Sequence, residues 1–175
     1  MAEIPAEMNR NNREPDQDFF PDEYLYRRVP ELLWDDDEID VAAIELPDMS
    51  VNRQKFGPAW WVRFVETENS TSGARSFTLT EMGVIGFKSK DVPPRQAFRG
   101  AFVYRFQVVH APEKYNYPHS EIRAFESKFG DPDGPETHVD GKGLIHRIDP
   151  VWHLEWRERL ARKCRVVLRP RESAE

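Results

Sequence analysis

Residues 101–109 carry the pattern that most restricts the fold of this chain. Large apolar side chains occupy every second position, at Phe102, Tyr104, Phe106 and Val108. A period of two residues is typical of a β-strand with one buried face, because successive side chains point to opposite sides of an extended backbone. The fold must therefore include a sheet that this strand can join.

A second pattern, close to the C-terminus, is helical. Trp152, Trp156 and Leu160 recur at intervals of four residues and lie on one face of an α-helix. Pro150 suits the first position of such a helix, and several basic side chains occupy its last turns, where the helix dipole favours cations. We predict a helix over residues 150–163.

Shorter segments rich in apolar, aromatic or β-branched residues predict further strands. They are residues 24–29, 40–46, 60–65, 82–87 and 164–168. At residues 60–65 a helix is the alternative, because Pro58 lies just before the segment. With the helix packed on one face, these patterns predict a single α+β domain with a mostly antiparallel sheet.

The length of 175 residues is typical of one domain. Residues 1–18 are polar and charged with few apolar side chains, so we predict a disordered acidic and polar arm. The folded domain is expected to span residues 19–170, starting at the first large aromatic side chains, with a flexible tail at 171–175.

The net charge of −6 is unevenly distributed. Residues 1–50 hold 15 acidic and 4 basic side chains, whereas residues 51–175 hold 16 acidic and 21 basic ones. This asymmetry indicates one of three arrangements: an acidic arm folded back on a basic surface, an acidic partner such as nucleic acid for the basic part, or two solvated faces.

The single cysteine, Cys164, excludes an internal disulfide and a multi-cysteine zinc site. The N-terminus lacks the basic and apolar regions of a secretory signal, and no segment approaches the ~18 apolar residues of a membrane span. We therefore predict a cytoplasmic protein without membrane association. We expect no cofactor and no metal, because no complete motif for either is present.

The segment from His110 to Glu121 is the strongest candidate for a catalytic site. Two histidines, His110 and His119, flank a loop that Pro112 and Pro118 restrict. Histidine transfers protons near neutral pH, so this pair, with Glu121 orienting one ring, suits phosphoester hydrolysis. The same three side chains are also suitable metal ligands. Alternatively, His110 ends a strand and His119 hydrogen-bonds the backbone of the loop, so that both have only a structural role.

Five further residues are candidates for ligand binding. They are Arg27, Arg28, Tyr115, Asn116 and Tyr117. Adjacent arginines in an aromatic setting can bind phosphate and stack on bases, and the three loop residues lie between the two histidines. The pI of about 5.5 argues against nucleic acid, since nucleic-acid-binding domains usually have a pI above ~9.

Four short motifs between residues 24 and 170 are similar to those of a group of short uncharacterised bacterial proteins. They are a YRR-P start at 26–30, an S-V-x-R step at 50–53, an H-x-P…N…P-H segment at 110–119 and an end that runs from A-R-K to proline at 161–170. The chain departs from the group at Tyr117, which separates an asparagine and a proline that are adjacent there. The resemblance implies a bacterial source and brings no mechanism.

No complete catalytic signature is present, and the chain is rich in aromatic residues for a hydrophilic protein. The leading hypothesis is therefore a non-enzymatic accessory or protein-interaction module that works with a larger bacterial partner. The alternatives are a small histidine-based hydrolase, nuclease or metal-binding protein that uses residues 110–121, and polyanion binding through the basic C-terminal helix.

Overall fold

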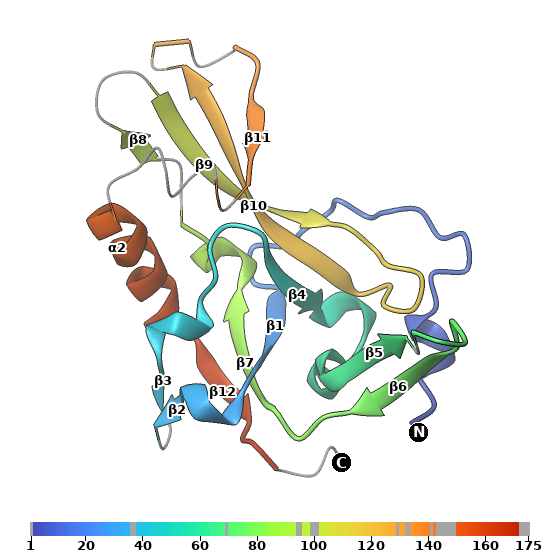
Figure 1. Cartoon of the computed structure of the whole chain (residues 1–175). Helices are drawn as coiled ribbons and strands as arrows, with labels where there is room; N and C mark the ends of the chain where they lie inside the picture. The colour runs from blue at the N-terminus through green and yellow to red at the C-terminus, as the bar shows by residue number, and fades with distance from the viewer. Residues whose placement is uncertain are drawn as a thin grey trace.

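An eight-stranded antiparallel sheet forms the centre of the molecule (Figure 1). The computed structural model describes residues 2–35, 38–68, 70–93, 96–98, 102–128, 130–131, 134–140, 142 and 150–171. Seven strands follow the spatial order β12–β7–β1–β4–β10–β9–β8, and β11 pairs with β10. Their bounds are β1 Tyr24–Val29, β4 Met49–Arg53, β7 Gly83–Lys88, β8 Gln96–Phe98, β9 Phe102–His110, β10 His119–Lys128, β11 Thr137–Val139 and β12 Arg165–Leu168.

Two small hairpins and several 3₁₀ turns complete the chain. The hairpins are β2 (Trp34–Asp35) with β3 (Glu38–Ile39), and β5 (Phe64–Glu68) with β6 (Arg75–Leu79). The 3₁₀ turns are η1 Ala6–Met8, η2 Glu31–Leu33, η3 Val41–Ala43, η4 Gln54–Phe56, η5 Ala59–Arg63 and η6 Ser89–Asp91.

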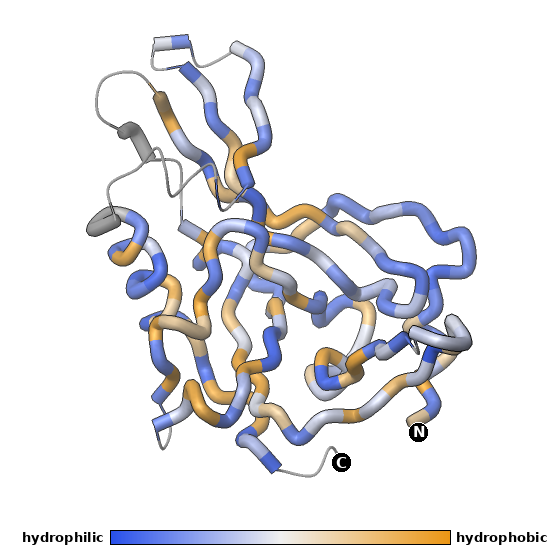
Figure 2. The backbone as a smooth tube through the Cα atoms, in the orientation of Figure 1, coloured by the Kyte–Doolittle hydropathy of each residue, from blue (hydrophilic) through white to orange (hydrophobic). Residues whose placement is uncertain are grey.

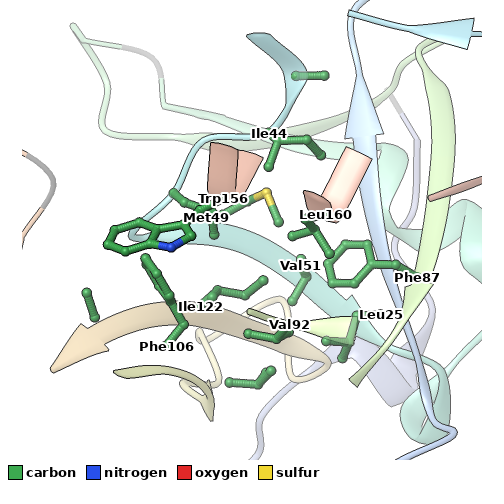
Figure 3. Close-up of a cluster of buried hydrophobic side chains, with 14 of the residues drawn as sticks. Leu25, Ile44, Met49, Val51, Phe87, Val92, Phe106, Ile122, Trp156 and Leu160 are labelled. Atoms are coloured by element: carbon green, nitrogen blue, oxygen red, sulfur yellow. The ribbon is translucent and has the colours of Figure 1, made fainter. Parts of the chain in front are cut away.

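Helix α2 (Pro150–Ala161) covers one face of the sheet and encloses the main core with it (Figure 3). Trp156 and Leu160 are both buried in this core, and the Trp156 ring lies 5.1 Å from Phe106 in an edge-to-face arrangement. The α+β class, the mostly antiparallel sheet and the C-terminal helix on one face are therefore confirmed. The side chain of Trp152 lies outside the described part of the chain.

The strands predicted at 24–29, 82–87, 101–109 and 164–168 form within one residue or so of their expected bounds. The strand predicted at 40–46 is wrong, because Asp40 accepts a hydrogen bond from the Ala42 amide at 2.7 Å and turns the chain into η3. The strand predicted at 60–65 is also wrong over most of its length. Trp61, Val62 and Arg63 are buried in succession, which a strand with one buried face does not allow, and they form the 3₁₀ turn η5.

The arm predicted to be disordered is instead packed against the domain over residues 2–18. Its backbone bonds to β6 and to the 113–116 loop, from Ala2 to Phe77 at 2.9 Å and from Arg10 to Lys114 at 2.9 Å. Met8 is only 1% exposed. Figure 2 shows that much of the segment leading to β1 is hydrophilic, so polar contacts rather than a large apolar area hold it. The acidic arm thus folds back onto basic residues, as the Asp16–Lys55 pair at 2.6 Å illustrates.

Two further expectations concern the ends of the chain and the membrane. The predicted tail at 171–175 lies outside the described residues except for Arg171, whose amide bonds to Glu81 at 2.8 Å. In the part of the chain that the structure describes, no helix has the length and apolar character that crossing a membrane would require.

Candidate functional site: a polar pocket beside Arg28

A polar pocket of about 480 Å³ opens beside the sheet, on the side of the β5–β6 hairpin. Its walls come from β1, β4, both hairpin strands, the loop at residues 113–116 and Met8 of the N-terminal arm. Four of the five predicted binding residues line it together: Arg27, Arg28, Tyr115 and Asn116. Residues far apart in the sequence therefore meet at one open cavity.

Strands β1 and β4, which both contribute to the pocket wall, pair over only two residues. Leu25 lies opposite Arg53 and Tyr26 opposite Asn52, after which β1 continues beside β7 and β4 beside β10. Arg27 spans the resulting gap. Its guanidinium donates to the carbonyl oxygens of Ala43 at 2.8 Å and Ser50 at 3.2 Å, and to the Glu45 carboxylate at 2.7 Å. All three guanidinium nitrogens of Arg27 therefore bond within the protein, and the residue has a structural role.

Arg28 has a different environment from its neighbour. Its side chain points to the opposite face of β1, where Nη1 donates to the carbonyl oxygens of Val62 at 3.1 Å and Phe64 at 3.2 Å. Within the described residues it forms no ion pair with a carboxylate. Burial, followed by the charge of Arg27, lowers the pKa of Arg28. A half-buried cation therefore faces an open pocket while most of its donors have no protein partner.

The amides of Asn52 and Asn116 form a reciprocal pair in the wall of the same pocket. Each Nδ2 donates to the Oδ1 of the other at 3.1 Å, which fixes both side chains. An amide nitrogen carries two protons, so each keeps one further donor. Asn116 and Tyr115 are half-buried, and the Tyr115 ring rests edge-on against Phe77 at 5.3 Å.

His110 lies outside the pocket, where it is buried and both of its ring nitrogens form hydrogen bonds. It is 2% exposed, Nδ1 accepts the Asp16 amide proton at 2.8 Å, and Nε2 donates to the Tyr117 carbonyl at 2.7 Å. Because Nδ1 accepts, the proton of the neutral ring sits on Nε2. The ring stacks on Phe56 at 5.0 Å, and burial lowers its pKa.

His119 and Glu121 do not join His110. His110 pairs with Ser120 across β9 and β10, so the preceding residue, His119, points to the other face of the sheet. The His119 Nδ1 donates to the Ala111 carbonyl at 2.8 Å, and its Nε2 lies 3.3 Å from the Ser50 hydroxyl at the pocket wall. Glu121 forms an ion pair with Arg123 at 2.7 Å.

The proposed catalytic trio is thus distributed over two faces of the sheet rather than gathered in one cleft. Among the residues that the structure describes, no group of three or more His, Cys, Asp or Glu side chains could hold a metal ion.

Tyr117, the fifth predicted binding residue, secures the arm instead of lining the pocket. Its hydroxyl donates to the Glu14 carbonyl at 3.0 Å, and the Arg13 guanidinium lies 3.6 Å from the ring centre. The basic helix is also partly used within the fold. Arg157 donates to the carbonyl oxygens of Val41 at 2.9 Å and Ile44 at 2.6 Å, which leaves polyanion binding by this helix a prediction.

Sequence reasoning missed several pocket residues. Ser50 and Asn52 had a usable signal, because they alternate with the buried Met49 and Val51 along β4 and so had to share a polar face. Met8 and Phe77 had none, since only the folded arm and the β5–β6 hairpin bring them to the pocket.

No protein-family model matches this chain, and neither a curated protein nor a solved structure matches it.

Proposed function

We propose that this chain is a non-enzymatic protein-interaction module and that its recognition site is the pocket beside Arg28. A carboxylate on a segment of the partner protein enters the pocket and pairs with the guanidinium. The observation that carries this proposal is the half-buried Arg28 side chain, which lines an open cavity and forms no ion pair with a described carboxylate.

A carboxylate offsets the cost of holding this charge away from water. Burying a cation is unfavourable unless it is paired and hydrogen-bonded, and the lowered pKa of Arg28 is consistent with that cost. The planar guanidinium presents several donors in a fixed fork that matches a carboxylate. The two backbone acceptors on Nη1 hold the fork in place before a ligand arrives.

The other donors of the pocket favour the same ligand. The second amide proton of Asn116 and the hydroxyl of Tyr115 are both available at half-buried positions. A volume of about 480 Å³ suits one or two side chains or a chain end, rather than a whole macromolecular surface. The resemblance described above implies a bacterial source, and we propose a larger bacterial protein as the partner.

Two matched pools of labelled peptides test the proposal by fluorescence anisotropy. Both pools are degenerate hexapeptides blocked at the two ends, and they differ only in a central Asp or Asn. We expect the Asp pool alone to bind, and Arg28→Gln to weaken that binding by roughly tenfold or more. Arg165→Gln, which removes an exposed arginine of strand β12 that does not line the pocket, is the control and should bind normally. Equal binding of both pools, or binding that Arg28→Gln leaves unchanged, would contradict the proposal.

A further inference from the structure

We infer that the segment bound in the pocket is zwitterionic, with a basic side chain beside Glu113 when its carboxylate meets Arg28. This inference rests on the proposed function and names the chemistry of its ligand. It starts from a second charged group in the same pocket, the Glu113 carboxylate, which lies on the wall formed by the 113–116 loop.

Glu113 differs from the other acidic residues of the pocket. Glu45 is paired with Arg27 at 2.7 Å, and Glu66 is paired with Arg75 at 2.8 Å. Glu113 is exposed and, among the described residues, makes no ion pair. It is therefore the acidic group of the pocket that is available to a cation from outside.

Arg28 and Glu113 interact through space without touching. The charge of Glu113 raises the pKa of Arg28, against the larger lowering by burial, yet the two groups form no ion pair. The Arg28 side chain and the backbone of Glu113 are each held by hydrogen bonds. Arg28 bonds the carbonyl oxygens of Val62 and Phe64, and Glu113 sits in a tight turn closed by two backbone bonds to Asn116 at 3.2 and 3.3 Å.

The N-terminal arm strengthens this separation of charge. The Arg10 amide bonds to the Lys114 carbonyl at 2.9 Å, so the turn that carries Glu113 is attached to the arm and cannot readily move toward Arg28. Two opposite charges are thus presented apart in one pocket. A ligand with only an acidic group meets repulsion from Glu113, and one with only a basic group meets repulsion from Arg28.

The aromatic wall does not provide a competing cation site. Lys114 Nζ lies 4.8 Å and the Arg75 guanidinium 5.9 Å from the Tyr115 ring centre, so this ring already has cations of the protein nearby. The basic group of a ligand is therefore directed to the Glu113 carboxylate rather than to the ring.

Four blocked peptide pools that share one scaffold test the inference by isothermal titration calorimetry. They carry an Asp–Lys pair, an Asp–Gln pair, an Asn–Lys pair or an Asn–Gln pair, with the two residues separated by zero to three others. For an exposed ion pair we expect the Asp–Lys pool to bind about fivefold more tightly than the Asp–Gln pool. In Glu113→Gln this advantage should disappear, and the Asp–Gln pool should bind at least as well as to the wild type.

Glu155→Gln on α2 is the matched control, because it removes the same charge from an exposed position away from the pocket, and the Lys advantage should persist in it. Equal affinity of the wild type for Asp–Lys and Asp–Gln, or a Lys advantage that survives Glu113→Gln, overturns the inference. If the acidic pools still depend on Arg28 in that case, the proposed function stands without it. If no pool responds to Arg28→Gln, the proposed function itself is wrong.

Discussion

The buried cluster around Arg53 and the open pocket around Arg28 lie on opposite faces of the same sheet and use the same side chain in opposite ways. Arg53 is 0% exposed, and its guanidinium bonds both oxygens of Glu23 at 2.9 and 2.8 Å and the carbonyl oxygens of Asp16 and Asp18. The Phe19 ring covers it at 3.8 Å. Arg28 bonds two carbonyl oxygens and forms no ion pair within the described residues.

The difference teaches how to separate a structural arginine from a recognition arginine. A fully buried guanidinium is tolerated only when partners take up its donors, and once they do, no capacity remains for a ligand. A half-buried guanidinium that faces a cavity with unused donors retains that capacity. His110 follows the first pattern, because both of its ring nitrogens are engaged by the backbone.

The largest expected effect comes from Arg53→Gln. The change leaves the buried Glu23 carboxylate without its cation and removes the anchor of the arm at Asp16 and Asp18, so we expect a loss of about 3–5 kcal/mol in the free energy of unfolding. Urea denaturation measures this loss. A second variant that also carries Glu23→Gln should recover part of it, because no unpaired carboxylate remains. A loss below about 1 kcal/mol would show that the hydrogen bonds and the ion pair of Arg53 do not stabilise the fold as described above.

We expect the titration of His110 to have an effect on stability that is intermediate between those of Arg53→Gln and Arg28→Gln. Burial lowers the pKa of His110 in the folded state, while the unfolded chain protonates near the ordinary value of 6.5. Below pH 6.5 the unfolded chain therefore binds more protons than the folded one. The free energy of unfolding then decreases as the pH is lowered, until the lowered folded-state pKa is reached. The slope from one group is at most about 1.4 kcal/mol per pH unit.

Urea denaturation between pH 7.5 and pH 4.5 measures this slope. His110→Asn is the control, because it does not titrate but keeps an acceptor for the Asp16 amide. The wild type should lose stability more steeply than this variant. Parallel losses in the two proteins would mean that His110 is not the neutral, buried group that the geometry indicates.

The smallest expected effect on stability is that of Arg28→Gln. It is the same substitution as in Arg53→Gln, but Glu23 keeps its partner and only two bonds to carbonyl oxygens are altered. We expect a change below about 1 kcal/mol, within the range of single hydrogen bonds. Urea denaturation beside Arg53→Gln checks this. A loss as large as that of Arg53→Gln would make Arg28 a structural residue and end the contrast between the two sites.

Residue patterns alone predicted the elements whose periodicity decides their structure. The alternation of Phe102 to Val108 and the four-residue spacing that includes Trp156 and Leu160 each require burial of one face, and strand β9 and helix α2 form accordingly. The loop residues Tyr115 and Asn116 and the arginine pair were also predicted as binding residues, although the sequence offered no reason to expect them at one pocket.

Only the tertiary structure decided which polar groups are engaged and which remain available. Arg27 and Arg28 are adjacent and chemically identical, and they differ because one spans the gap between β1 and β4 while the other faces the hairpin side. The arm gave no local signal for order, since its partners, Phe77, Lys114 and Arg53, lie far away in the chain. The periodicity of apolar residues is local in the sequence and predicts which face of an element is buried. Whether a polar group finds all its hydrogen-bond partners depends on residues that only folding brings together.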